Sequence, residues 1–275
     1  MIGLDLQILG PGLIAALLVL ATHVPLGMIV LERSIIFIDF ALALAAATGV
    51  AFARMMWGDA DTWLTQGSAI GAALSCAALL VWTDRRYAIK QEVVIGAVCV
   101  NMAAVLLILL SYDSSGAEFL ELLLIGQILW AEPLQLVIVG LVYAVALVVW
   151  IYRDLGREPV LFYVVFAVVI AFSVQIVGIL LVFASLLVPA LAAHAAPSGW
   201  RHLIAFNVGV VGYLAGLVIS VLFIIPTGTT IVCTLVLAAL VTHAVVVRRG
   251  HGNAVNDEDN SAKVTKPVNS PGTAE

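Results

Sequence analysis

Charged side chains are scarce in this chain of 275 residues. Only 11% of the residues are Asp, Glu, Lys or Arg, whereas 63% are hydrophobic, and the mean hydropathy is +1.16. A soluble domain of this length needs far more charge to cover its surface, so the composition predicts a protein embedded in a lipid bilayer. The twelve basic residues are scattered over the whole chain, and we expect no nucleic-acid partner.

Several catalytic signatures are also missing. The sequence holds only three lysines and no G-x-x-x-x-G-K-[ST] motif, which excludes ATP binding through a P-loop in this chain. It holds no H-E-x-x-H, no G-x-S-x-G and no two-carboxylate constellation at membrane depth. Cys76, Cys99 and Cys233 lie apart in apolar stretches, and we interpret them as core residues. We therefore expect no enzyme and no permanently bound cofactor.

Apolar runs long enough to cross a bilayer fill most of the chain. They are residues 9–30, 35–54, 67–82, 93–111, 134–151, 160–196, 202–224 and 229–247. As one helix the sixth run would measure roughly 55 Å against a hydrocarbon core of about 30 Å, so we expect two helices with a break near 175–178. The shorter piece at 119–130 is expected to be re-entrant or interfacial. The prediction is an all-α polytopic membrane bundle with eight or nine transmembrane helices.

Basic residues fall on alternate loops of this scheme. One set of loops holds Arg33, Arg85, Arg86, Lys90, Arg153, Arg157, Arg201, Arg248 and Arg249. The other set is acidic, with Arg54 only at its edge. Lys and Arg favour the cytoplasmic side of a membrane. Nine spans, with an outside N-terminus and a cytoplasmic C-terminus, place all of the basic loops on that side. Residues 1–248 are the expected transmembrane domain, and the polar residues 249–275 are expected to be a disordered cytoplasmic tail.

Asp39 lies inside an apolar run, just after Glu32 and Arg33. An ionisable group at membrane depth is costly and indicates a pathway, a partner or a structural pairing. If the first two helices form a hairpin that turns near Arg33, His23 and Asp39 lie roughly 15 Å and 9 Å from the turn, and the two side chains can approach each other. In the alternative interpretation, His23 bonds a carbonyl freed by Pro25 and Asp39 caps or pairs near the helix end.

Four motifs occur in order along the chain. They are P-L-G at 25–27, leading through Arg33 and Asp39 to G-V-A-F at 49–52; L-I-G-Q-I-L at 124–129; V-G-I-L-L-V-F-A-S-L-L-V-P-A at 177–190; and P-T-G-T-T at 226–230. Together they resemble the permeases of the zinc/manganese/iron uptake family of ABC transporters. The resemblance implies the membrane-spanning permease subunit of an importer for a divalent transition metal.

The same resemblance implies partners and a location. We expect a homodimer in the bacterial plasma membrane, with a separate cytoplasmic ATPase subunit as the energy source and an extracytoplasmic metal-binding protein that delivers the cargo. In this family and in the similar vitamin B12 and siderophore permeases, a helix after the third motif docks on the ATPase. In this sequence that helix would cover about 190–201, and the residues assigned to it are Pro189, Ala190, His194 and Arg201. A plain helix–loop–helix turn is the alternative.

The chain departs from the family pattern at three places. The family's histidine, four residues after the aspartate, is Ala43; the acidic residue of L-F-G-D is Gln127; and the aspartate before P-x-G-P is replaced by Ile224 and Ile225. Because transition metals prefer imidazole and carboxylate ligands, these departures leave open which metal is carried and whether the cargo is a metal. The retained aspartate needs a partner from elsewhere, and His23 is the candidate.

Two other classes stay open at this point. A secondary transporter would use Asp39 as a coupling carboxylate, but it predicts inverted repeats, and the sequence shows none beyond generic apolar runs. A membrane scaffold that transports nothing is the third class, since the family's ligand set is depleted.

Overall fold

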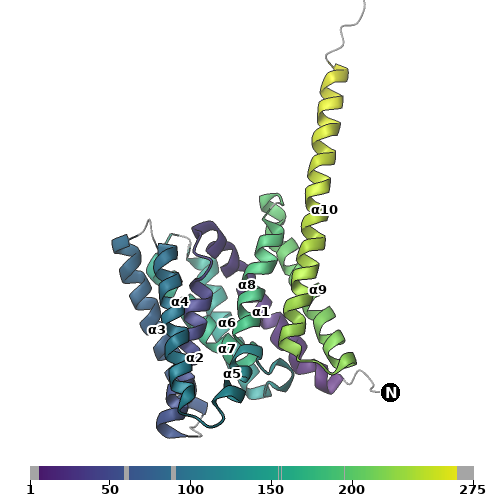
Figure 1. Cartoon of the computed structure of the whole chain (residues 1–275). Helices are drawn as coiled ribbons and strands as arrows, with labels where there is room; N and C mark the ends of the chain where they lie inside the picture. The colour runs from purple at the N-terminus through teal and green to yellow at the C-terminus, as the bar shows by residue number, and fades with distance from the viewer. Residues whose placement is uncertain are drawn as a thin grey trace, which may run out of the picture.

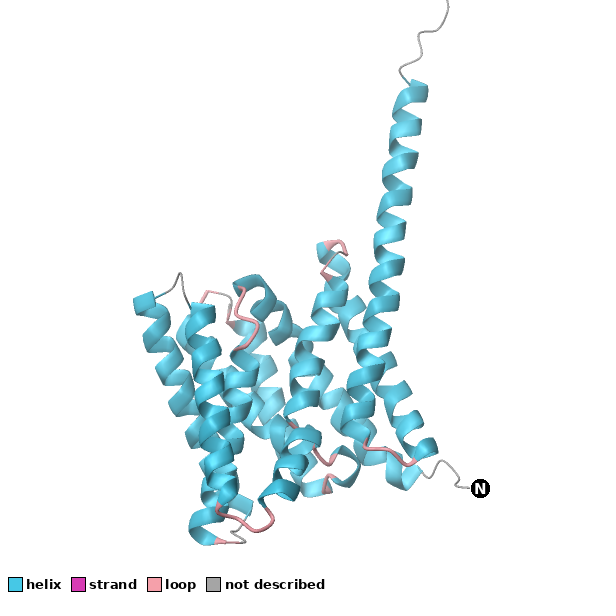
Figure 2. Ribbon diagram, in the orientation of Figure 1, coloured by secondary structure: helices cyan, strands magenta, loops and turns pink. Residues whose placement is uncertain are grey.

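The structure is a computed structural model that describes residues 6–58, 62–87, 91–153, 155, 157–194 and 196–264. Figure 2 shows helices joined by loops, and no strand occurs in these ranges. The elements are α1 (Leu6–Arg33), α2 (Ile38–Trp57), α3 (Thr62–Tyr87), α4 (Gln91–Ser111), α5 (Gly116–Ile125), η2 (Ile128–Trp130), α6 (Pro133–Tyr152), α7 (Pro159–Val177), α8 (Ile179–Ala193), η3 (Ser198–Trp200), α9 (Arg201–Phe223) and α10 (Thr227–Val264). The predicted all-α polytopic bundle is confirmed.

Eight of the described helices are long and apolar enough to cross a membrane, namely α1, α2, α3, α4, α6, α7, α9 and α10. The long run at 160–196 is split as predicted, because α7 ends at Val177 and α8 begins at Ile179, with Gly178 between them. With 15 residues, α8 measures only about 22 Å. It is a shorter apolar helix beside eight candidate spans, which agrees with the expected eight or nine.

The loops that the sequence marks as basic meet at one end of the bundle, called the basic end below. Arg33, at the α1–α2 turn, donates to the Leu155 carbonyl between α6 and α7 (3.0 Å) and lies 4.8 Å from the centroid of the Phe162 ring. Gln91, at the start of α4, donates to the Tyr163 hydroxyl near the start of α7 (3.3 Å). These contacts bring three of the basic connections together, as the alternation of charges predicts.

The opposite end, called the acidic end below, holds Arg54 in an ion pair. Its Nε lies 2.8 Å from Asp113 Oδ2, its guanidinium donates to Ser115 Oγ (2.8 Å), and its Cζ is 4.6 Å from the Phe119 ring centroid. Hydrogen bonds from the Ser115 backbone and hydroxyl, aided by Arg54, hold the pKa of Asp113 below its ordinary value. The single basic residue at the edge of the acidic loops is therefore paired, and it ties α2 to α5.

The short piece at 119–130 forms α5 and η2, which pack against the α7–α8 break. Gln127 donates its backbone N–H to the Ile176 carbonyl (3.0 Å). Gly126 and Gly178 adopt φ angles of 73° and 78°, and a Cβ on either residue would overlap the backbone of the other segment. Only glycine adopts such angles without strain, so these two residues permit the close approach of two non-helical segments.

Helix α10 runs from Thr227 to Val264 and extends past the other helices at the basic end (Figure 1). Its membrane-length part is Thr227–Val245. Residues 249–264 are helical in the structure, whereas the sequence predicts disorder there. Residues 265–275 lie outside the described ranges. The division into a transmembrane domain and a tail at residue 249 stays a prediction.

Replacing either glycine of the break should destabilise the protein. We expect Gly178→Ala and Gly126→Ala each to lower the free energy of unfolding by at least about 1 kcal/mol, because a side chain at positive φ is strained and meets backbone. The matched control is Gly71→Ala in α3, where a Cβ meets nothing within 4 Å. Melting temperatures of the purified variants in detergent test this expectation, and equal values for all three would contradict it.

Candidate functional site

Asp39 lies in the first turn of α2 and is completely buried, with 0% of its surface exposed. Neither carboxylate oxygen has a hydrogen-bond partner within the described part of the chain. The alternative interpretation, in which Asp39 caps a helix or pairs at its end, therefore has no contact to support it. A buried carboxylate without a partner is strongly destabilising, and each such group in a native structure calls for an explanation.

Two side chains of α4 lie beside this turn of α2. The Phe37 backbone N–H donates to Glu92 Oε1 (3.4 Å), and the Cys99 thiol donates to the Phe37 carbonyl (3.5 Å). Reasoning from the sequence did not select either α4 residue, although an acidic residue at the start of a spanning helix is a visible signal.

His23 of α1 is also completely buried, but its polar groups are satisfied. Its Nδ1 lies 2.9 Å from the Val19 carbonyl, and its Nε2 lies 3.2 Å from Ser173 Oγ of α7. Because a carbonyl only accepts, Nδ1 donates to Val19. The Ser173 hydroxyl donates to the Val169 carbonyl of its own helix (2.7 Å), and its oxygen is also in hydrogen-bond contact with Nε2. The Tyr143 hydroxyl of α6 lies 2.6 Å from the same Oγ. The result is a buried network that joins α1, α6 and α7.

The structure does not bring His23 and Asp39 into contact. His23 bonds within α1 and to α7, whereas Asp39 has no hydrogen-bond partner among the described residues. The carbonyl that His23 reaches is that of Val19, four residues back, and not one freed by Pro25. No group of three or more His, Cys, Asp or Glu side chains in the described ranges is arranged to hold a metal ion. The metal-binding roles of His23 and Asp39 stay predictions.

The segment expected to contact the ATPase lies where α8 passes into α9. Helix α8 continues past Pro189 to Ala193, His194 follows in a turn, and η3 precedes α9, which begins at Arg201. The prediction of one helix over 190–201 is wrong, because Pro197 is extended (φ −55°, ψ 142°) and interrupts it. Arg201 Nε donates to the Ala196 carbonyl (2.9 Å) and closes the connection. In Figure 1 the α8–α9 connection lies at the basic end.

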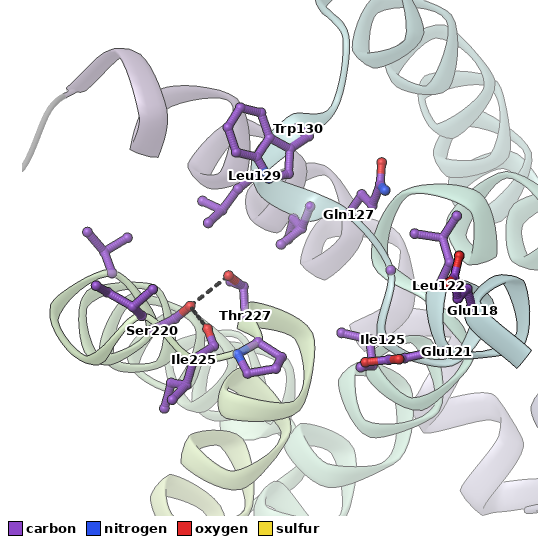
Figure 3. Close-up of a pocket in the computed structure, with 15 residues that line it drawn as sticks. Glu118, Glu121, Leu122, Ile125, Gln127, Leu129, Trp130, Ser220, Ile225 and Thr227 are labelled. Carbon is purple, nitrogen blue, oxygen red and sulfur yellow. Dashed lines mark hydrogen bonds between the residues drawn. The ribbon is translucent and has the colours of Figure 1, made fainter.

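An open cavity of about 590 Å³ lies at the acidic end, between α5–η2 and the α9–α10 turn (Figure 3). Glu118 and Glu121 of α5 line one side of it, and Thr227 lies at the other, 2.7 Å from Ser220 Oγ. Gln127 and the pair 224–225, two of the departures from the family pattern, line this same cavity. About a hundred residues separate these segments in the sequence, so no local pattern predicts their meeting.

Taken together, the fold and these sites define a multi-pass membrane protein whose polar features lie at the two ends, in the buried network around His23 and at one buried carboxylate. The chain belongs to the ABC 3 transport family, which matches residues 5–157 and 156–246. This match covers the whole of the helical bundle and confirms the family resemblance of the four motifs. It also goes against a secondary transporter.

Two solved structures share the fold. PsaBC from Streptococcus pneumoniae in complex with Fab is 24% identical, with a TM-score of 0.67 over 86% of this chain and 90% of that chain. A protein described as a metal-chelate type ABC transporter, in an inward-facing conformation, is 14% identical, with a TM-score of 0.50 over 87% of this chain and 77% of that chain. At these identities the likeness shows the fold alone.

The buried network around His23 predicts a stability effect. We expect His23→Ala to destabilise the protein by about 1–3 kcal/mol, because it leaves the Ser173 hydroxyl without one partner and opens a cavity. Tyr143→Phe should cost about 1 kcal/mol, since only one hydrogen bond is lost. Tyr112→Phe is the control, because that side chain is 75% exposed. Thermal melting with parallel uptake assays decides the role: lost uptake at unchanged stability of His23→Ala would favour a pathway role instead.

Proposed function

We propose that the chain is the permease subunit of an ABC importer that moves a divalent transition metal, namely zinc, manganese or iron, into the cytoplasm. Membership of the ABC 3 transport family supplies the transporter class. The observation that supports a metal as the cargo concerns Asp39, whose carboxylate is 0% exposed and has no hydrogen-bond partner in the described chain. A group of this kind is stabilised when a cation arrives from outside to compensate its charge.

The energy for transport comes, in this proposal, from a separate ATPase subunit. The sequence holds no P-loop, so the chain itself supplies the pathway and the mechanical contact. The basic end faces the cytoplasm of a bacterial cell, as the distribution of Arg and Lys favours, and α10 extends to the same side as far as Val264. The α8–α9 connection, with His194 exposed, then meets the ATPase.

At the acidic end, an extracytoplasmic binding protein delivers the ion. The carboxylates of Glu118 and Glu121 border the open cavity there, and negative charge at a mouth raises the local concentration of cations. Two copies of the chain form the pathway at their interface. The metal is cargo, and no cofactor is bound permanently. The ligand that completes the site with Asp39 comes from His23 after a rearrangement, or from another group that reaches α2.

The proposal predicts that Asp39→Asn abolishes uptake and leaves the protein assembled. Asparagine has the same shape but no charge, and removing an unpaired buried charge does not reduce stability. Uptake of radioactive zinc, manganese and iron into cells that also express the ATPase and binding protein is the measurement. We expect a loss of at least roughly tenfold, as when a main charged ligand is removed. Asp84→Asn, half-buried at the basic end, is the control, and normal uptake by Asp39→Asn would overturn the proposal.

The α8–α9 connection yields a second expectation. Arg201→Ala removes the bond that closes this connection, so ATP hydrolysis should persist while metal uptake falls. Both rates are measured on the reconstituted transporter. Arg153→Ala is the matched control, since this arginine lies at the same end and its side chain is 64% exposed. Uptake and hydrolysis that stay coupled in Arg201→Ala would count against the assigned contact.

A further inference from the structure

Helix α2 begins without a cap from its own sequence. Ser34, in the preceding turn, has a φ of 55°, and Phe37 stands at the N-cap position, where no side-chain cap bond forms. The first N–H groups of a helix have no partner inside the helix, and Ser, Thr, Asp or Asn usually supplies one. Here Glu92, at the start of α4, accepts from the Phe37 N–H (3.4 Å). Its carboxylate bonds the N–H of the N-cap residue, as the Glu of a capping box does from within its own helix, and lies at the favourable end of the helix dipole.

A second side chain of α4 reaches the same residue. The Cys99 thiol donates to the Phe37 carbonyl (3.5 Å), which also accepts the Ala41 N–H inside α2 (3.0 Å). Glu92 and Cys99 are seven residues apart, which is about two helical turns and places them on one face of α4. The two side chains therefore hold both backbone polar groups of Phe37 from one neighbouring helix.

Phe37 is two residues from Asp39, whose carboxylate has no partner of its own in the described chain. Such a carboxylate cannot be oriented by its own hydrogen bonds, so its position depends on the backbone that carries it. Phe37 is 49% exposed, so the packing of its own side chain contributes little to holding that backbone. A displacement of about 1 Å at a reacting or binding group can reduce function roughly a hundredfold.

We infer that Glu92 and Cys99 are positioning residues for Asp39: from α4 they hold the first turn of α2 and thereby set where the carboxylate meets the transported cation. This inference rests on the proposed function of Asp39 in the pathway. Glu92 acts as a hydrogen-bond acceptor and Cys99 as a donor. Neither is a metal ligand in this scheme.

Paired substitutions at Glu92 and at Cys99 distinguish a role in positioning Asp39 from a role as a metal ligand. Glu92→Gln keeps an acceptor and removes the charge, whereas Glu92→Ala removes both. Cys99→Ser keeps a donor and removes the soft ligand, whereas Cys99→Ala removes both. The permease, reconstituted with its ATPase and binding protein, is assayed for uptake over a range of zinc and manganese concentrations. Hydrogen–deuterium exchange of a peptide covering 35–41 reports directly on the first turn of α2.

We expect both alanine variants to exchange faster in this peptide and to show an apparent KM raised about tenfold, the order expected when a helix cap is lost, with a smaller change in maximal rate. The conservative variants should stay near the wild type in both readouts. Glu32→Ala, an exposed carboxylate at the same end, is the control and should change neither.

Three results would overturn the inference. Glu92→Gln as impaired as Glu92→Ala would mean that the charge is needed, which makes Glu92 a ligand. Unchanged exchange in the alanine variants would mean that α4 does not hold this turn. Faster exchange with a wild-type KM would mean that the turn does not position Asp39. If Asp39→Asn transports normally, the proposed function fails, while the exchange data still report on the contacts of Phe37.

Discussion

Within a bilayer, every backbone polar group must find its partner inside the protein, and this requirement organises the whole bundle. It is most demanding at Gly178, where the chain leaves α7 and starts α8. The segment around Gly126 covers that break, and the Gln127 N–H bonds the Ile176 carbonyl. Gly228, at the start of α10, packs on the neighbouring Ile125 carbonyl. Four helices thus meet at one joint, and the cavity of the acidic end lies beside it.

The same requirement separates two buried ionisable residues. His23 has both ring nitrogens bonded, to Val19 and Ser173, so its burial is compensated and it links three helices. Asp39 has no such compensation within the described chain. A satisfied buried network favours a single packing arrangement, whereas an unsatisfied buried carboxylate costs stability and calls for an explanation. The difference makes Asp39 the stronger candidate for the pathway and makes the structural interpretation of His23 the simpler one.

The sequence predicted the helices well and their contacts poorly. The break near 175–178, the short piece at 119–130 and the gathering of basic loops at one end all follow from hydropathy and charge along the chain. The approach of His23 to Asp39 rested on depth alone, and depth does not specify which side of a helix a residue occupies. The expectation of a single helix over 190–201 overlooked Pro197, whose extended backbone interrupts that helix.

By itself, the sequence determined the membrane environment, the order of the spans and the permease family. A bilayer requires long apolar segments, which composition reveals, and the family motifs are short stretches of consecutive residues. Only the tertiary structure decided that Gln127 and Ile225 line one cavity, and that Glu92 and Cys99 hold Phe37. The reason is physical: helices that are apolar all round carry no polar stripe to show which face turns inward. Their rotation is settled by close packing and by a few polar contacts between residues far apart in the chain.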